Sequence, residues 1–175
     1  RQGSSQIQPV DLAAVTREVI DLMRATLPKS IDIRDRISLK SARTLADPSQ
    51  MHQVLMNLCT NAYQAMETGG GELTVALAPV RWETDRQFRT CRLPAGEYIA
   101  LSVGDTGRGI SAENLERIFD HYFTTKTPDH GTGLGLSVTL SIVKSHGGAI
   151  EVRPRSRRTV FTVYLPASAR TPATA

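Results

Sequence analysis

Two glycine-rich segments hold the residues of this chain whose types and spacing are best suited to chemistry. Residues 104–110 are Gly-Asp-Thr-Gly-Arg-Gly-Ile, and residues 131–136 are Gly-Thr-Gly-Leu-Gly-Leu. Glycine permits positive φ angles and lets the backbone approach a ligand closely. Asp105, in the first segment, follows an apolar strand pattern, and a charged acceptor there makes a strong hydrogen bond to an amino group such as that of adenine. Each turn alone is common, but the pair predicts a nucleotide site built largely from backbone.

The second segment leads into a helical pattern of apolar residues. Backbone N–H groups at the start of a helix, together with the helix dipole, favour anions. Gly131, Gly133 and Gly135 are therefore interpreted as a phosphate cradle. A hinge is the alternative, and the two roles are compatible.

Side-chain amides form a third cluster, on the helix that the spacing predicts over residues 48–67. At 100° per residue, Asn57, Asn61 and Gln64 lie together at the edge of an apolar stripe. A carboxamide oxygen is a suitable ligand for Mg²⁺, which keeps most of its waters and binds substrate phosphates. Exposed amides on a solvated face are the alternative. The stripe itself consists of Met51, Val54, Leu55, Leu58, Ala62 and Ala65.

Helices and strands that would position these groups follow from periodicity and capping signals. Asp11 caps a first helix that ends before Pro28, and Asp47-Pro48 opens the second, which Gly69-Gly70-Gly71 stops. A short helix is predicted near 112–118 and a third long one, largely buried, over 134–143. Strands are predicted at 30–38, 73–77, 99–103, 150–152 and 161–165, with a long hairpin excursion over 79–96. The pattern predicts a two-layer α/β sandwich, in which a mixed, mostly antiparallel sheet of about five strands packs on three helices.

Composition places the chain among ordinary globular proteins: 175 residues, 40% hydrophobic, 22% charged, with a net charge of +4. No apolar run approaches the roughly 18 residues that a membrane helix needs, so no membrane contact is expected. Two cysteines give no disulfide framework or zinc site, and the chain fits a reducing cytoplasm. Four arginines near the C-terminus are interpreted as a solvated turn rather than a nucleic-acid site, because no aromatic residues are interleaved: Arg153, Arg155, Arg157 and Arg158.

Four motifs occur in a fixed order: Asn-(x)3-Asn at 57–61, Asp-x-Gly-x-Gly at 105–109, Ile-Phe-x-x-Tyr-Phe-Thr-Thr-Lys at 118–126 and the glycine segment 131–136. They resemble the N box, first glycine box, F box and second glycine box of the ATP-binding domain of sensor histidine kinases, most of all the nitrogen-regulation-like and hybrid branches. The resemblance implies the Bergerat fold shared with gyrase B, Hsp90 and MutL. It assigns 11–168 to the kinase domain, 1–10 to the end of a linker from a dimerisation domain, and 169–175 to a disordered tail or linker.

The same resemblance implies roles for single residues. Asn61 would ligate Mg²⁺, Asn57 would lie near the phosphates of ATP, and Asp105 would bind the adenine amine with help from Thr159 through water. Asn57 and Lys126 are the implied catalytic residues, and His121, where the family usually has Pro, touches no proposed ligand. The implied nucleotide-binding set is Asn57, Asn61, Ala65, Asp105, Gly107, Gly109, Ile110, Thr125, Lys126, Gly131, Thr132, Gly133, Leu134, Gly135, Leu136 and Thr159.

One residue separates phosphoryl transfer from hydrolysis. Gyrase-like and Hsp90-like relatives carry a Glu where this chain has Asn57, and an amide cannot act as general base for water. None of the four histidines matches the acceptor pattern: His52, His121, His130 and His146. The expectation is a kinase domain that supplies ATP to a histidine on a separate dimerisation domain, in a homodimer that signals to a response regulator receiver domain. A non-catalytic nucleotide-binding scaffold and a Ser/Thr kinase on the same fold are the alternatives. Membrane anchoring through segments outside the chain stays open.

Overall fold

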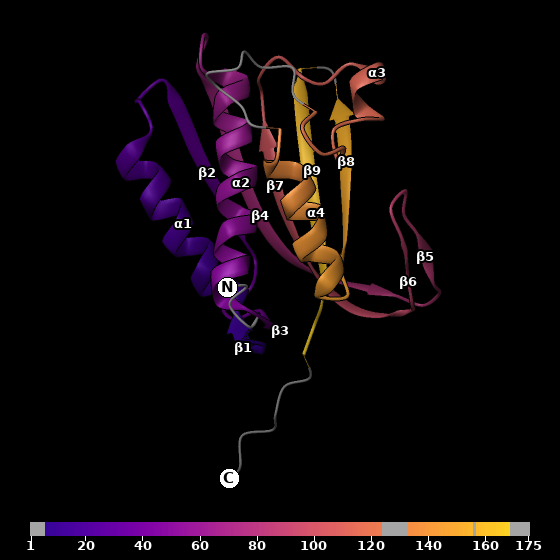
Figure 1. Ribbon diagram of the computed structural model, residues 1–175. Helices are drawn as coiled ribbons and strands as arrows, with labels where there is room; N and C mark the ends of the chain where they lie inside the picture. The colour runs from indigo at the N-terminus through magenta and orange to yellow at the C-terminus, as the bar shows by residue number, and fades with distance from the viewer. Residues whose placement is uncertain (1–5, 124–132, 156, 169–175) are drawn as a thin grey trace.

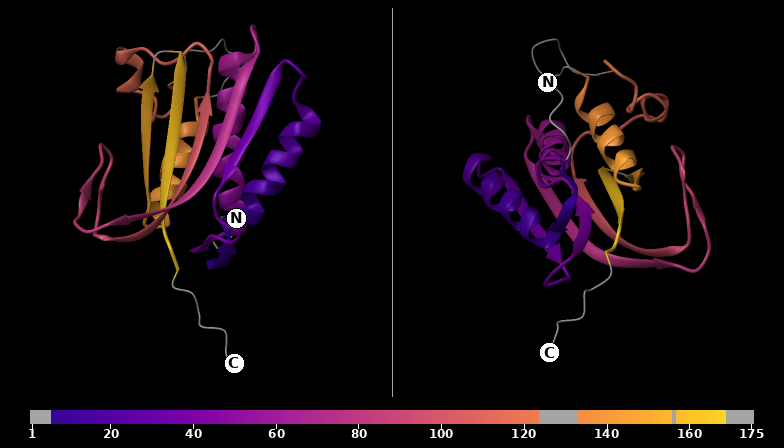
Figure 2. Two further views of the ribbon diagram at one scale, coloured as in Figure 1. Left: turned by 180° about the vertical axis from the view of Figure 1, so that it is seen from behind. Right: turned by 60° about the horizontal axis from the view of Figure 1, so that its bottom comes forward.

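The computed structural model describes residues 6–123, 133–155 and 157–168. These residues form two layers, a five-stranded sheet in the order β2-β4-β7-β9-β8 and a layer of helices on one of its faces (Figures 1 and 2). β2 runs parallel to β4, and every other pair of neighbours is antiparallel. The predicted sandwich of a mixed, mostly antiparallel sheet and helices is confirmed.

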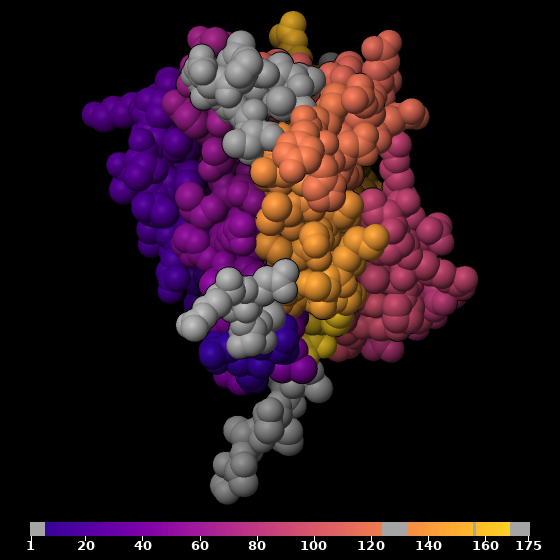
Figure 3. Space-filling model, viewed as in Figure 1, coloured from indigo at the N-terminus to yellow at the C-terminus, as the bar shows by residue number. Residues whose placement is uncertain are grey.

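Three long helices lie side by side across the inner face of the sheet (Figures 1 and 3): α1 (Leu12–Thr26), α2 (Pro48–Met66) and α4 (Gly135–Ser145). The predicted caps are present, with Asp11 accepting from the Ala13 N–H and Asp47 from the N–H groups of Ser49 and Gln50. The Ser49 hydroxyl, 2.6 Å from the Asp47 carboxylate, is the main reason that the pKa of Asp47 falls to about 2. The short helix expected over 112–118 is only one turn, α3 (Ala112–Leu115), because Glu116 already serves as its C-cap. In the described ranges, none of the helices has the length and apolar character needed to cross a membrane.

Four strands of the five-stranded sheet, β4, β7, β8 and β9, extend further than the sequence predicted, whereas β2 is one residue shorter at each end. The ladder between β4 and β7 continues to the pair Trp82 and Gly96, so the excursion covers only residues 83–95. Residues 8–11, most of which were assigned to the end of a linker, form a strand in which Pro9 pairs with Leu45. The strands are β1 (Gln8–Asp11), β2 (Ile31–Ile37), β3 (Arg43–Ala46), β4 (Gly71–Trp82), β5 (Arg86–Gln87), β6 (Arg92–Leu93), β7 (Gly96–Asp105), β8 (Ala149–Arg155) and β9 (Arg158–Pro166).

The main core lies between α2 and the inner face of the sheet. Leu55 and Leu58 of α2 are buried against alternate residues of the central strands, such as Leu73 and Leu101. Each fully buried side chain of this size contributes about 1.5–3 kcal/mol relative to exposure. Cys59 lies in the same core as a free thiol, and burial raises its pKa to about 12, so it is an unreactive packing residue.

A second, smaller cluster lies on the outer face of the sheet. Trp82 packs against Phe88, Tyr98 and Tyr164 at ring-centroid distances of 5.6, 4.6 and 5.0 Å. Phe88 belongs to the β5–β6 excursion, which folds back over this end of the sheet, and Arg86 places its guanidinium 5.3 Å from the centre of the Trp82 ring. We call these residues the outer aromatic cluster. The other end of the outer face carries small and polar side chains around a hollow of about 200 Å³.

The third long helix is less buried than its apolar pattern predicted. Ile142 and Val143 are buried, whereas Leu136, Val138 and Leu140 are only partly buried against the core. Buried positions on α4 are instead shared with two polar residues, Ser137 and Thr139, whose hydroxyls donate to the carbonyls of Leu134 and Gly135. These hydrogen bonds remove most of the cost of burying the hydroxyls.

Candidate functional site

A buried carboxylate ends β7. Asp105 is only 5% exposed, and burial raises the pKa of its carboxyl, partly offset by the Gly107 N–H that donates to its Oδ1 at 2.9 Å. The turn interpretation and the ligand interpretation of Asp105 are therefore compatible, because Oδ1 shapes the turn while Oδ2 has no protein donor among the described residues. A buried carboxylate without a neighbouring cation is costly unless its oxygens accept hydrogen bonds, so Oδ2 is suited to accept one from a ligand.

Thr159 lies directly beside Asp105. The two residues pair across β7 and β9, and Thr159 is 3% exposed. Its hydroxyl is buried and has no hydrogen-bond partner within the described part of the chain. Buried polar groups are rarely left unpaired, and a ligand or an ordered water is the usual reason for an exception. An acceptor carboxylate next to an unpaired hydroxyl fits the amino edge of a purine base.

The first glycine segment is joined to the last turn of α2. A Cβ added to Gly107 would lie 2.3 Å from the Ala65 carbonyl oxygen, and the Arg108 N–H donates to that same oxygen at 3.1 Å. The space beside Gly107 is thus filled by helix backbone, which places Ala65 at the site. Gly109 has a φ of 75° and open space where a side chain would project, and Ile110 packs on the core.

Asn57 connects the two helices that flank the site. Its Nδ2 donates to the Gly135 carbonyl at 3.2 Å and to the Thr139 hydroxyl at 3.3 Å, so α2 is joined to the first turn of α4. Asn61 lies one turn further along α2 and is half-buried. Both amides line the edge of the apolar stripe, as the sequence predicted.

The N-terminus of α4 is suited to an anion. No side chain caps it among the described residues, and it starts at Gly135, after Leu134. The first N–H groups of a helix have no partner within the helix. Gly133 has a φ of 68°, and its carbonyl accepts from the Tyr122 N–H at 3.1 Å. A Cβ on Gly133 would lie 2.5 Å from the Tyr122 carbonyl carbon, so a glycine is required there.

Some predicted site residues lie outside the described residues: Thr125, Lys126, Gly131 and Thr132. Of those described, the structure gathers Asp105, Thr159 and Gly107 at one end and Asn57 and Gly135 near the α4 N-terminus. No group of three or more His, Cys, Asp or Glu is placed to hold a metal ion in residues 6–123, 133–155 and 157–168.

Sequence reasoning missed two contacts at the candidate site. The Thr106 hydroxyl accepts from the Glu72 N–H at 2.9 Å, directly beside Asp105, and Thr139 receives Asn57. The available signals were that Thr106 is a polar residue inside the turn motif and that Thr139 is a polar residue on the buried face of a helix. His146 has a structural role: its Nε2 accepts from the Asp47 N–H at 3.1 Å while Nδ1 lies 2.7 Å from the Ile142 carbonyl, which assigns the proton to Nδ1.

Comparison with known proteins gives a consistent family. The model of the histidine kinase-, DNA gyrase B-, and HSP90-like ATPase family matches residues 46–169. The sensor histidine kinase ZraS of Salmonella typhimurium is 34% identical over 173 residues, which cover 94% of this chain and 34% of that protein. The chain spans 18% to 41% of the length of this and other sensor kinases that it matches.

Solved structures agree with the sequence match. A nucleotide-free catalytic domain of the histidine kinase ThkA superposes with a TM-score of 0.72 at 32% identity, and 92% of this chain and 95% of that chain are covered. ThkA in complex with the response regulator protein TrrA gives 0.69 at 28% identity, with 94% of this chain and 42% of that chain covered.

Proposed function

This chain belongs to the histidine kinase-, DNA gyrase B- and HSP90-like ATPase family, and we propose that it binds Mg-ATP and presents the γ-phosphate to a histidine of a separate domain in a sensor histidine kinase. The observation that carries the proposal is the buried Asp105 carboxylate beside the unpaired Thr159 hydroxyl. Together they select a base with an exocyclic amine, because the carboxylate accepts and the hydroxyl can complete the contact through water.

The base would lie over the first glycine segment. Gly109 leaves open space and Ile110 offers an apolar edge, so a flat ring can pack there. Asp105 would then orient the base through its exocyclic amine. The carboxylate is already buried and held by the Gly107 N–H, so it needs little rearrangement to accept a hydrogen bond from the amine.

The phosphates would lie toward α4. The uncapped helix start at Gly135 supplies N–H donors and the positive end of the helix dipole. Asn61 is the proposed protein ligand of Mg²⁺, which supplies charge neutralisation on phosphate oxygens when bound. A single amide fits this ion, because Mg²⁺ is usually held by few protein groups together with water and substrate phosphates.

Transfer is favoured over hydrolysis by Asn57. Its Nδ2 donates to the Gly135 carbonyl and the Thr139 hydroxyl, and its amide has no acid–base function at neutral pH. A water near the γ-phosphate would therefore lack a general base at this position. The domain acts by positioning and charge stabilisation, as is usual in phosphoryl transfer.

The acceptor and the partners are part of the proposal. His146 is buried in a structural hydrogen-bond pair, so it does not serve as the acceptor. We place the acceptor histidine on the dimerisation domain of a homodimeric kinase. The structure of ThkA with the response regulator TrrA supports a receiver domain as the next acceptor.

Calorimetry with ADP and Mg²⁺ tests the first half of the proposal. Wild-type protein should bind, and Asp105→Ala should not bind at the same concentrations. Radiolabelled ATP then tests transfer in the full-length kinase, in which an acid-labile, base-stable phosphoprotein is expected. Acid-stable phosphate would indicate a Ser/Thr kinase, and ADP binding without any phosphoprotein would indicate a scaffold.

A further inference from the structure

We infer that Thr106 is a positioning residue for the base-binding carboxylate: its hydroxyl replaces the last rung of the β4–β7 ladder and so fixes the turn on which Asp105 is carried. The inference rests on the proposed function, since it gives Thr106 a part in selecting adenine. It concerns a side chain to which the motif resemblance assigned no role.

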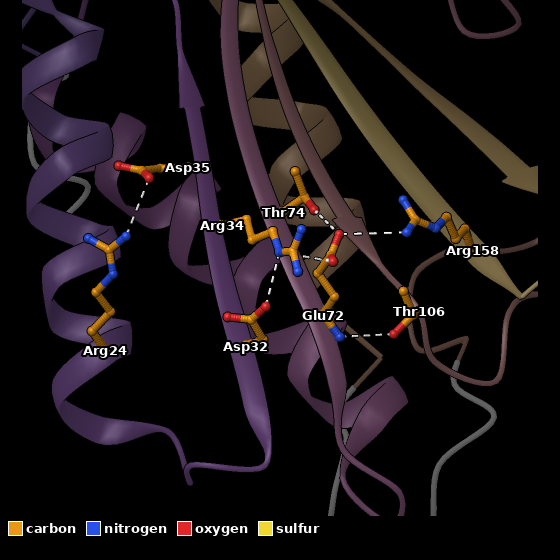
Figure 4. Close-up of polar contacts among 8 residues, drawn as sticks. All are labelled: Arg24, Asp32, Arg34, Asp35, Glu72, Thr74, Thr106 and Arg158. Atoms are coloured by element: carbon orange, nitrogen blue, oxygen red, sulfur yellow. Dashed lines mark hydrogen bonds and ion pairs between the residues drawn. The ribbon is translucent and has the colours of Figure 1, made fainter.

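The key contact joins the turn to the first residues of β4. The ladder pairs Leu73 with Asp105 and stops there. Beyond it, the Glu72 N–H donates to the Thr106 Oγ1 at 2.9 Å (Figure 4). A side-chain oxygen thus takes the place of a main-chain carbonyl as acceptor. The backbone after Asp105 is free to leave the sheet without leaving the Glu72 N–H unpaired.

The pocket around this hydroxyl leaves little room for another position. Thr106 Oγ1 lies 3.7 Å from the Met66 sulfur at the end of α2. A Cβ added to Gly71 would lie 2.5 Å from that oxygen and 2.7 Å from the sulfur. The hydroxyl is therefore enclosed by the end of α2 and the start of β4, so its position is defined on both sides.

Asp105 is held between two fixed points as a result. Asp105 pairs with Leu73 in the β4–β7 ladder. The residues that follow Asp105 are held by the Thr106 hydroxyl and by the Arg108 N–H, which donates to the Ala65 carbonyl. Loss of the Thr106 hydroxyl would leave a part-buried N–H unpaired and release the turn from β4. The carboxylate would then lose orientation relative to the base.

The Glu72 side chain provides a matched control, because it lies in a separate network. Its carboxylate contacts Arg34 at 3.1 Å, Arg158 at 3.6 Å and the Thr74 hydroxyl at 3.0 Å (Figure 4). The donor to Thr106 is the backbone N–H of Glu72. Glu72→Gln therefore weakens the ion pairs on the outer face while it keeps the contact with Thr106.

The test compares ADP with inosine diphosphate, which has a carbonyl where adenine has its amine. Calorimetry in Mg²⁺ should show that wild-type protein prefers ADP. Thr106→Val should weaken ADP binding by about tenfold, as expected for a lost hydrogen bond and an unpaired donor, and should leave inosine diphosphate affinity nearly unchanged. Thr106→Ser should restore the preference, and Glu72→Gln should retain it.

Thr162→Val is the second control, since its hydroxyl bonds to Ser102 at 3.0 Å on the same face, away from the turn. It should lower stability without changing the ratio of the two affinities. If Thr106→Val does not fold, Thr106→Ala removes the same hydroxyl without an added methyl. An unchanged ratio in the folded Thr106 variant, with normal ADP binding by wild type, would overturn the role of Thr106 alone. Failure of wild type to bind either nucleotide would overturn the proposed function and this role together.

Discussion

The first glycine segment is anchored to the core of the molecule, whereas the second is joined to the turn that precedes it and to one side chain of α2. Thr106 and Arg108 connect the first to β4 and to α2 through hydrogen bonds that involve main-chain groups. Gly133 is held by the Tyr122 N–H, and Gly135 by the Asn57 side chain. In the proposed site, the same residue type therefore serves two purposes: the first segment forms a fixed site for the base, and the second leads into a helix end that offers donors to the phosphates.

Removal of the carboxylate that is proposed to bind the base is expected to have the largest effect. Asp105→Ala should weaken ADP and adenosine binding alike by about 100-fold, because a hydrogen bond to a charged group is lost from a buried site. Calorimetry measures both ligands, with Asp120→Ala, an exposed aspartate, as the control. Wild-type affinity in Asp105→Ala would show that the first segment does not select the base.

Stability should distinguish Gly107 from Gly109, two of the three glycines of the first segment. Gly107→Ala forces a methyl group against the Ala65 carbonyl and should lower the free energy of unfolding by about 2–3 kcal/mol. Gly109→Ala meets no neighbour and should cost about 1 kcal/mol through its positive φ alone. Urea titrations measure both. Equal losses would mean that the contact with α2 does not anchor the turn.

The second segment should affect only ligands that carry phosphates. Asn57→Ala removes the two hydrogen bonds to α4. It should weaken ADP binding by about tenfold, because a displaced N-terminus of α4 loses a charge-assisted hydrogen bond to the phosphates. Adenosine affinity should stay as in wild type. Competition experiments with the two ligands give the ratio. A parallel loss for adenosine would remove the distinction between a base end and a phosphate end.

The smallest expected effect is a change in the pH dependence of stability. Burial raises the pKa of Asp105, so the folded state binds the proton more tightly than the unfolded chain does. The ionised carboxyl therefore lowers stability at neutral pH, and this penalty disappears as pH falls through the raised pKa toward the ordinary value of 3.8. Asp105→Asn, which keeps an acceptor for Gly107, should be more stable than wild type at neutral pH, and unfolding curves at acidic pH should converge.

The helices could be predicted from the sequence because their signals are local. Asp11 and Asp47 each precede an apolar period, and both cap a helix at the predicted residue. The short strands β1 and β3 were missed because each depends on the other for pairing, over a separation that a periodic pattern does not report.

The residues of the candidate site could be proposed from the sequence, but their contacts could not. Asp105 and Thr159 belong to distant parts of the sequence and become neighbours only through the register of β7 and β9. Gly107 was assigned to the nucleotide-binding set, and nothing in the local sequence indicated that the space beside it is filled by Ala65. Register and helix packing decide such contacts, and neither is a property of local sequence.

The outer aromatic cluster has a consequence for optical experiments. Trp82 is the chain's single tryptophan, and it pairs with Gly96 at the far end of the β4–β7 ladder from Asp105. At about 3.3 Å per residue, these ends are about 30 Å apart. Intrinsic fluorescence excited at the indole band should therefore follow the docking of the β5–β6 excursion, and emission should stay constant when a nucleotide is added. A tryptophan introduced at Ile110 would give the binding site an optical signal of its own.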